Sequence, residues 1–250
     1  MPESKTTGPI NQLLDIMEKL RDPNGGCPWD LEQNFETIAP HTIEEAYEVA
    51  EAIARNDMAE LKDELGDLMF QVVFYAQMAK EAGDFDFNDV IEAISEKMIR
   101  RHPHVFGSAD IATAEAQTTA WEETKARERA AKKKDSDKAP SALDGVAETL
   151  PALTRAVKLQ KRAARVGFDW PSIAPVFEKI EEELGELRAE INDGGSKDRI
   201  AEEYGDLLFV LANMGRHLEL EPETVLRNAN RKFIRRFQIV EQRIEATGKS

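Results

Sequence analysis

The chain has 250 residues, with 48 acidic against 33 basic side chains and a formal net charge of −15. So acidic a balance disfavours non-specific nucleic-acid binding, which depends on basic surface, and is typical of a protein that collects divalent cations. Hydrophobic residues make up 41% of the chain, yet no apolar stretch reaches the roughly 18 to 20 residues that span a bilayer. Because Cys27 is the only cysteine and the N-terminus lacks a signal-like apolar stretch, we expect a cytoplasmic protein that binds neither nucleic acid nor membrane.

Apolar residues at helical spacing predict a series of helices in the first half of the chain. They cover residues 10–21, 41–55, 58–82, 87–101 and 111–130. Thr42, with Glu45 three residues later, has the pattern of a capping box at the start of the second of these helices. Residues 124–140 are charged and almost free of apolar side chains, which indicates a linker.

The second half of the chain has the same character. Helices are predicted from about residue 150 to 165 and over 173–192, 197–218 and 222–246. Alternating strand patterns are absent, so the sequence predicts an all-α fold. We expect an N-terminal domain at residues 1–124, a charged linker at 125–145 and a C-terminal domain at 146–250.

An internal repeat organises these helices. Glu64-Leu65-Gly66-Asp67 recurs as Glu203-Tyr204-Gly205-Asp206, 139 residues later. Glu44, Glu45 and Glu48 recur 138 residues later as Glu182, Glu183 and Glu186, and Lys97 and Arg101 recur 135 residues later as Lys232 and Arg236. Offsets that drift by only a few residues indicate a duplicated domain.

The repeated acids predict a metal site. A single Glu-x-x-Glu is usually a solvated helix face, but here two acidic helices joined by a short turn occur twice. Gly66 and Gly205 lie within the second helix of each pair, where glycine destabilises a helix by roughly 1 kcal/mol relative to alanine. Their presence therefore indicates either close helix packing or room for a ligand. Carboxylates that face one another repel unless cations lie between them.

The types of side chain in the repeated motifs restrict which metal ion they could bind. A di-iron bundle would use Glu-x-x-His motifs, and none of the four histidines has a glutamate three residues before it. Carboxylate oxygens alone suit Mg²⁺, with Mn²⁺ as a possible substitute. Mg²⁺ usually arrives with phosphates, which the basic helix ends could hold, so the pattern favours phosphoanhydride or phosphodiester chemistry.

These motifs resemble the MazG family of nucleoside triphosphate pyrophosphohydrolases in its two-domain form. Further matching segments are Gly26-Cys27-Pro28-Trp29-Asp30 and Val166-Gly167-Phe168-Asp169-Trp170, with residues 143–146 and 150–153. The resemblance implies a homodimer of helical bundles that uses Mg²⁺ to hydrolyse a nucleoside triphosphate to the monophosphate and pyrophosphate.

The resemblance also implies roles for residues of both repeats. It implies that the metal ligands are Glu183, Glu186, Glu203 and Asp206 in the second repeat and Glu44, Glu45, Glu48, Glu64 and Asp67 in the first. It implies that Glu182 binds the metal or orients the water, that Lys179, Arg199, Lys232 and Arg236 bind phosphates, and that Lys97, Arg101, Trp170 and Asn230 bind substrate.

The repeats differ in their cations, because His41 and Glu60 stand where the second repeat has Lys179 and Arg199. Glu60 cannot hold a triphosphate at neutral pH, so we expect the main catalytic site in the second repeat. Two alternatives remain open. One is a relative with a narrower substrate, dUTP or phosphoribosyl-ATP, and the other is a non-catalytic, nucleotide-binding regulatory dimer.

Overall fold

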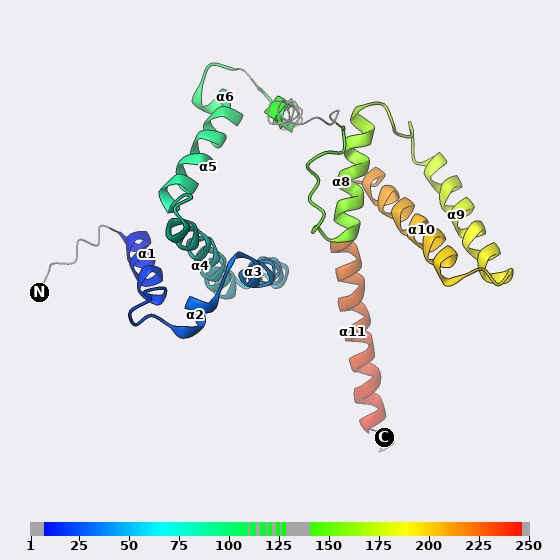
Figure 1. Cartoon of the computed structure of the whole chain (residues 1–250). Helices are drawn as coiled ribbons and strands as arrows, with labels where there is room; N and C mark the ends of the chain where they lie inside the picture. The colour runs from blue at the N-terminus through cyan, green and yellow to red at the C-terminus, as the bar shows by residue number, and fades with distance from the viewer. Residues whose placement is uncertain are drawn as a thin grey trace, which may run out of the picture. The chain divides into compact units, whose positions relative to one another are not determined.

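The computed structural model describes residues 8–109, 111–113, 116–118, 120–121, 124–125, 127–128 and 141–246. Every regular element in these ranges is a helix, so the prediction of an all-α fold is confirmed (Figure 1). The chain divides into two compact units, Met1–Thr124 (unit 1) and Lys125–Ser250 (unit 2). Most of the predicted linker, including residues 129–140, lies outside the described residues.

Unit 1 is built on an antiparallel pair of long helices. Its helices are α1 (Pro9–Leu20), α2 (Pro28–Glu32), α3 (Phe35–Arg55), α4 (Met58–Ala82), α5 (Phe87–Arg101) and α6 (Pro103–Phe106). Asn56 takes a left-handed conformation after α3, and the Asp57 carboxylate accepts hydrogen bonds from Ala59 N and Glu60 N to cap α4. This short turn returns the chain on itself, so that α3 and α4 pack side by side along their length.

The core of unit 1 lies where α1 and α3 cover the second half of α4. Met17, Ile38 and Phe74 are fully buried there. Arg21, at the end of α1, donates to the Glu81 carboxylate from Nε and Nη2 and lies over the Phe74 ring, 5.3 Å from its centroid. The apolar run of α4 is therefore buried on most sides, as its sequence indicates.

One predicted boundary is wrong. Helix α3 begins at Phe35 rather than near residue 41, because Asn34 caps it with hydrogen bonds from Glu36 N and Thr37 N. Thr42 lies inside the helix, where its hydroxyl donates to Ile38 O and hydrogen-bonds to the Tyr75 hydroxyl. Pro40 is accommodated within α3, although proline normally breaks a helix.

Unit 2 repeats the acidic hairpin. Its helices are α8 (Ala152–Arg165), α9 (Ala174–Asn192), α10 (Lys197–His217) and α11 (Pro222–Ala246). Ser196 caps α10 by accepting a hydrogen bond from Arg199 N, and α9 and α10 pack as an antiparallel pair. Helix α8 covers the other side of α10, where Gln160 Nε2 donates to Phe209 O at 2.8 Å.

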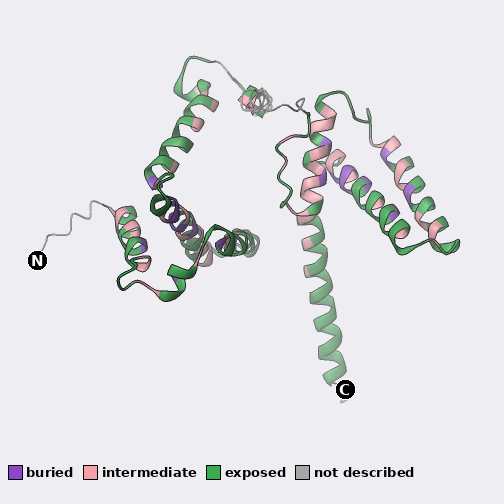
Figure 2. Ribbon diagram, in the orientation of Figure 1, coloured by how far each residue is buried: buried purple, intermediate pink, exposed green. Residues whose placement is uncertain are grey.

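The start of helix α11 is tied to unit 2 by hydrogen bonds. Glu223 Oε1 accepts a hydrogen bond from Leu153 N, and Glu221 Oε1 accepts one from the Thr154 hydroxyl, which ties the beginning of α11 to α8. Beyond these contacts α11 extends with no buried residue (Figure 2). No helix among the described residues combines the length and the apolar character needed to cross a membrane.

Candidate metal and nucleotide site

Three carboxylates meet between α9 and α10 of unit 2. Glu183, on α9, and Glu203 and Asp206, on α10, each offer an oxygen within 4.8 Å of the others. Glu183 and Glu203 are only 5% and 8% exposed. Acidic side chains are rarely so buried unless they are paired or bind a metal, and the antiparallel hairpin is what brings these acids together.

Two basic side chains of the same hairpin contact this cluster. Lys179 Nζ lies 2.8 Å from carboxylate oxygens of both Glu182 and Glu183. The hydrogen bonds to Glu182 and then to Glu183 raise the pKa of Lys179, so this lysine stays charged. Arg199 lies within 3.2 Å of carboxylate oxygens of both Glu190 and Glu203. Each cation therefore touches the cluster on one side and solvent on the other.

The local electrostatics favour a further positive charge. Burial raises the pKa of Glu203, and the nearby carboxylates of Glu186 and Asp206 raise it further, although Arg199 acts in the opposite direction. Lys179 and Arg199 thus do not fully balance the negative charge of the carboxylates. A group of carboxylate oxygens with unbalanced negative charge fits a hard divalent cation such as Mg²⁺.

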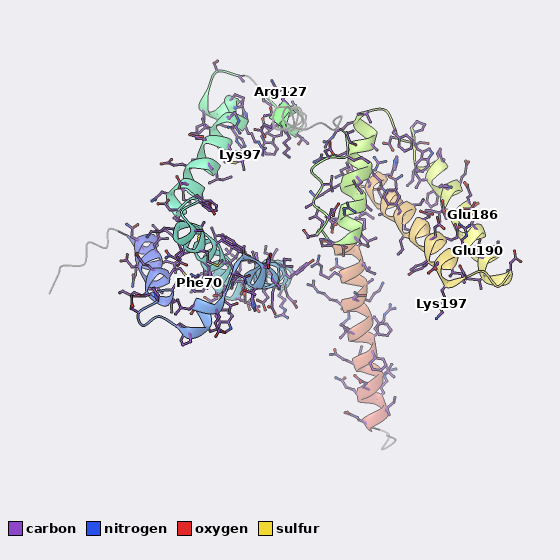
Figure 3. All side chains as sticks on the ribbon, viewed as in Figure 1. Phe70, Lys97, Arg127, Glu186, Glu190 and Lys197 are labelled. Carbon is purple, nitrogen blue, oxygen red and sulfur yellow. The ribbon has the colours of Figure 1, made fainter. Side chains whose placement is uncertain are left out.

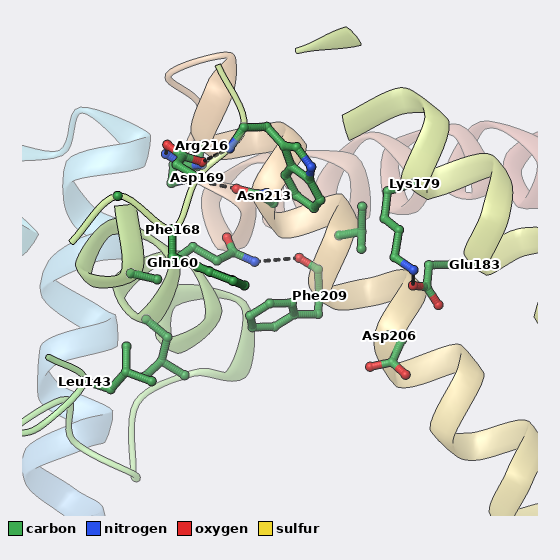
Figure 4. A pocket seen from close by; sticks show the side chains of 15 residues that line it. Leu143, Gln160, Phe168, Asp169, Lys179, Glu183, Asp206, Phe209, Asn213 and Arg216 are labelled. Carbon is green, nitrogen blue, oxygen red and sulfur yellow. Dashed lines mark hydrogen bonds and ion pairs between the residues drawn. The ribbon is translucent and has the colours of Figure 1, made fainter. Parts of the chain in front are cut away.

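A cavity of about 690 Å³ opens beside the acids (Figure 4). Lys179, Glu183 and Asp206 line one end of it, on α9 and α10. The rest of the lining is mainly apolar and aromatic, namely Leu143, Leu159, Ala163, Phe168, Phe209 and Val210, and the paired Asp169 and Arg216 line it as well. A cavity with acids at one end and a largely apolar lining elsewhere suits a ligand with one charged part and one apolar part.

An ion pair anchors the loop that closes the cavity. Arg216, in the last turn of α10, binds the Asp169 carboxylate with two N–H groups, and its Nε donates to Asn213 Oδ1 at 2.8 Å. Asp169 precedes Trp170, which also lines the cavity. Sequence reasoning selected Trp170 but missed Asp169, Arg216 and Gln160. The Val-Gly-Phe-Asp-Trp segment could have pointed to Asp169, whereas no sequence motif points to Gln160.

Unit 1 contains a related cluster of acids. Glu45, Glu48 and Glu64 offer carboxylate oxygens within 4.8 Å of one another. Burial raises the pKa of Glu45, and Asp67 and Glu48 add to the shift. Burial also raises the pKa of Glu64, and the Glu48 and Asp67 carboxylates contribute. Within the described ranges, no lysine or arginine forms an ion pair with Glu45, Glu48 or Glu64.

The cations of unit 1 are arranged differently. His41 lies 3.7 Å from Glu44 and packs edge-on against Trp29. Glu60, in the first turn of α4, binds Arg55 at the end of α3 at 3.3 Å. In unit 2 the corresponding link runs from Arg199, in the first turn of α10, to Glu190 near the end of α9. We call this link the hairpin clasp; the two units share it with the charges exchanged.

The structure places the remaining predicted acids at the edge of the clusters. Glu44 and Glu182 are exposed, and Glu182 is bound to Lys179. Glu186 lies outside the group of three in unit 2 and Asp67 outside that of unit 1, yet each influences the pKa of a clustered acid. Figure 3 shows Glu186 and Glu190 along α9.

The predicted cations of α5 and α11 lie outside the acidic hairpin of their own unit. Lys97 (Figure 3) and Arg101 belong to α5, which packs against α4 and α6. Asn230, Lys232 and Arg236 lie on the part of α11 that extends beyond its contacts with α8 (Figure 2). Unit 2 therefore assembles its acidic cluster with Lys179 and Arg199, and without the residues of α11.

Gly66 and Gly205 do not serve close packing within a unit. A Cβ atom built at either glycine meets no atom within 4 Å apart from its own helix and chain neighbours. Close packing within a unit therefore does not explain these two glycines in the part of the chain that the structure describes. Both glycines adjoin an aspartate of the acidic pair, where open space leaves room for a ligand.

Fold and site together define an all-α protein with two acidic helical hairpins suited to divalent cations. The MazG nucleotide pyrophosphohydrolase domain matches this chain twice, at residues 33–106 and 173–240. The chain therefore belongs to the MazG family, as its motifs predict. Each matched segment contains one complete set of acids.

Individual relatives extend along nearly the whole chain. A protein named nucleoside triphosphate pyrophosphohydrolase, from Escherichia coli K12, is 52% identical over 96% of this chain and 89% of its own length. The nucleoside triphosphate pyrophosphohydrolase/pyrophosphatase MazG of Thermotoga maritima is 44% identical over 96% of this chain and 88% of its own. The crystal structure of a MazG-related protein from Thermotoga maritima, 34% identical, matches 46% of this chain and 98% of its own with a TM-score of 0.39.

Proposed function

We propose that this chain hydrolyses nucleoside triphosphates between the α- and β-phosphates to give a nucleoside monophosphate and pyrophosphate, with its main site in unit 2. The observation that carries this proposal is an acidic cluster with two cations on the α9–α10 hairpin, beside a 690 Å³ cavity that α8 and the loop after it also line. The names of the Escherichia coli and Thermotoga relatives support the same reaction. These names do not favour either alternative. One alternative is a narrower substrate, dUTP or phosphoribosyl-ATP, and the other is a non-catalytic regulator.

We propose Mg²⁺ as the metal, with Mn²⁺ as a substitute. Glu183, Glu186, Glu203 and Asp206 would hold it in unit 2, and Glu45, Glu48, Glu64 and Asp67 would hold one in unit 1. When bound, such an ion neutralises phosphate charge and lowers the pKa of a coordinated water. The chain's own side chains then bind and orient the substrate.

The residues of unit 2 would divide this work by position. Lys179, at the charged end of the cavity, and Arg199, beside Glu203, touch the acids and reach solvent, so they would hold phosphate oxygens. Glu182, fixed by Lys179 at 2.8 Å, is placed to orient a water. Trp170 would contact the substrate in the cavity.

The cations of α11 would need a second copy of the chain. Lys232, Arg236 and Asn230 lie away from the acids of their own unit, and α11 exposes an apolar face. We propose a homodimer in which α11 meets its counterpart or a neighbouring hairpin and brings these residues to an acidic cluster. Lys97 and Arg101, on α5, would act in the same way for unit 1.

We further propose that the protein is cytoplasmic, since a single cysteine fits a reducing compartment. Its partners would be nucleoside triphosphates and a second copy of the chain. The domain boundaries are proposed at residues 1–124 and 146–250. Unit 1, where no lysine or arginine of the described residues pairs with Glu45, Glu48 or Glu64, would bind a divalent cation and turn over little or no substrate.

A product analysis tests the reaction. Purified protein is incubated with Mg²⁺ and each NTP and dNTP, and monophosphate, diphosphate, pyrophosphate and phosphate are resolved by ion-exchange chromatography. We expect monophosphate plus pyrophosphate, and no product in EDTA. Release of diphosphate and phosphate would contradict cleavage between the α- and β-phosphates.

A matched pair of variants tests the position of the site. Glu203→Gln keeps the side-chain shape but removes a ligand charge in unit 2, and Glu64→Gln makes the same change in unit 1. We expect Glu203→Gln to reduce turnover by about 100-fold or more, because charge at the reacting centre is lost. Glu64→Gln should retain most of the activity, and the reverse pattern would assign the reaction to unit 1.

A further inference from the structure

The apolar end of the unit 2 cavity contains one buried polar group whose hydrogen-bonding capacity is not filled. Gln160, on α8, lines the cavity and is only 7% exposed. Its Oε1 has no hydrogen-bonding partner among the described residues. Gln160 lies outside the segments that match the MazG domain, so the family match assigns it no role.

The orientation of this amide follows from its one contact. Gln160 Nε2 donates to Phe209 O at 2.8 Å, and turning the amide over would place two oxygens against each other. The donor of Gln160 is therefore used, and Oε1 is left as an acceptor. Figure 4 shows Nε2 directed at Phe209, with Oε1 turned away from that carbonyl, toward the side of the cavity where Asn213 lies.

A buried acceptor without a partner destabilises a fold, so its presence beside a cavity indicates a ligand that supplies the missing donor. The cavity already separates a charged end, with Lys179, Glu183 and Asp206, from the end that contains Gln160 and Phe168. A triphosphate at the charged end would place its base among the aromatic and apolar side chains. Bases removed from a helix are commonly bound in this way, by stacking and by hydrogen bonds to their edges.

We propose that Gln160 Oε1 accepts a hydrogen bond from an N–H group on the edge of the nucleobase. This inference rests on the proposed function and adds the residue that reads the base. Adenine and cytosine present an amino group, whereas guanine, uracil and thymine present a ring N–H. Gln160 Oε1, as the acceptor in this lining that has no partner, therefore accommodates every standard base and discriminates against a base edge that has no donor.

The first test removes the donor from the substrate and leaves the protein intact. Purine riboside triphosphate has the shape of ATP without its 6-amino group. We expect the wild-type protein to prefer ATP by about 3- to 10-fold in kcat/KM, the value of one hydrogen bond, with the difference mainly in KM. ATP, CTP, GTP and UTP should differ from one another by less than this. Equal kcat/KM for ATP and purine riboside triphosphate would overturn the proposal.

The second test removes the acceptor. Gln160→Met preserves the length of the side chain, and we expect the ratio of kcat/KM for ATP to that for purine riboside triphosphate to fall to about one. Gln71→Met is the matched control, because Gln71 is also buried and also has an unpartnered Oε1, but it belongs to unit 1. We expect Gln71→Met to leave the ratio unchanged. A ratio that survives in Gln160→Met would show that another group reads the base.

Failure of the proposed function gives a different result from failure of this inference. If every nucleotide is hydrolysed but ATP shows no advantage over purine riboside triphosphate, only the role of Gln160 is lost. If no nucleotide is hydrolysed, the proposed function fails, and calorimetric titration of the same two triphosphates with Mg²⁺ tests Gln160 directly. Binding of ATP that is about 3- to 10-fold tighter in the wild type, and equal in Gln160→Met, supports the assignment, whereas equal binding in the wild type overturns it.

Discussion

At the scale of single residues, the Asp169–Arg216 pair shows how one contact can position a whole wall of the cavity. Arg216 extends from α10 and holds Asp169, so the loop that carries Phe168 and Trp170 stays beside the α10 helix. Hydrogen bonding from Arg216 lowers the pKa of Asp169, and the positive charge of Arg216 adds to this effect. A carboxyl whose pKa is lower in the folded state stabilises the fold when it is ionised.

The sign of this effect gives a pH prediction for Asp169→Asn. The unfolded carboxyl has a pKa of about 3.9 and the folded one lies lower, so the stabilisation is present above about pH 4 and disappears as the pH falls through the folded-state value. We expect Asp169→Asn to lower the melting temperature of unit 2 at pH 7 by roughly 5 °C, because a hydrogen bond between charged groups is lost. Below pH 4 the wild type and the variant should converge.

Asp193→Asn is the control for this prediction. Asp193 belongs to the same unit, is exposed and forms no ion pair in the part of the chain that the structure describes. Its substitution should shift the melting temperature little at any pH. A gap between wild type and Asp169→Asn that stayed constant from pH 7 to pH 3 would show that shape, and not ionisation, carries the contribution of Asp169.

At the scale of the helices, most elements could be predicted because each carries its own periodicity and boundary signals. Helices α4 and α5 have the predicted bounds, as does α11. The acids of each hairpin could also be grouped, because fixed spacing on two antiparallel helices brings their faces together. Glu45, Glu48 and Glu64 meet for this reason, as do Glu183 and Glu203.

What the sequence could not supply depends on contacts between distant segments. Gln160 carries no motif, and its significance appears only when α8 covers α10 and leaves Oε1 without a partner. The basic ends of α5 and α11 were expected beside the acids, although helical spacing says nothing about where a whole helix lies. The predicted start of α3 is wrong because Thr42 and Glu45 have the spacing of a capping box, whereas Asn34 caps the helix and Thr42 lies inside it.

The corrected boundary of α3 gives a prediction for this helix. Asn34→Ala should lower the stability of unit 1 by about 1 kcal/mol, because two backbone N–H groups lose their acceptor. Hydrogen exchange at Glu36 and Thr37 should become faster in this variant. Thr42→Ala should leave exchange at those two amides unchanged, whereas faster exchange in Thr42→Ala alone would favour the boundary near residue 41.

At the scale of the whole molecule, the apolar face of α11 remains uncovered within unit 2. Phe233 and Phe237 stack against each other, with their ring centroids 6.1 Å apart, and are 68% and 52% exposed. Ile234, Val240 and Ile244 on the same helix are also exposed. Exposed apolar area of this kind marks an interaction surface, and a second copy of the chain would both cover it and bring Lys232 and Arg236 to the acids.

We therefore expect Phe233→Glu to separate the proposed dimer. Light scattering after size-exclusion chromatography should give twice the chain mass for the wild type and the single mass for the variant, with a parallel loss of turnover. Gln242→Glu adds the same charge to the opposite side of α11 and should remain dimeric and active. A wild-type protein that is monomeric and fully active at micromolar concentration would contradict the proposal.

The hairpin clasp has a consequence for how the two units came to differ. In unit 1 it joins Glu60 to Arg55, and in unit 2 it joins Arg199 to Glu190, so either arrangement of charge holds the turn closed. A duplicated gene segment could thus drift at this position without unfolding, while only one copy kept its arginine next to a buried glutamate. The two units thus share the acidic cluster and the closed turn, and they differ in which side chain of the clasp carries the positive charge. The two units of this polypeptide can therefore be compared with each other as copies of one duplicated segment.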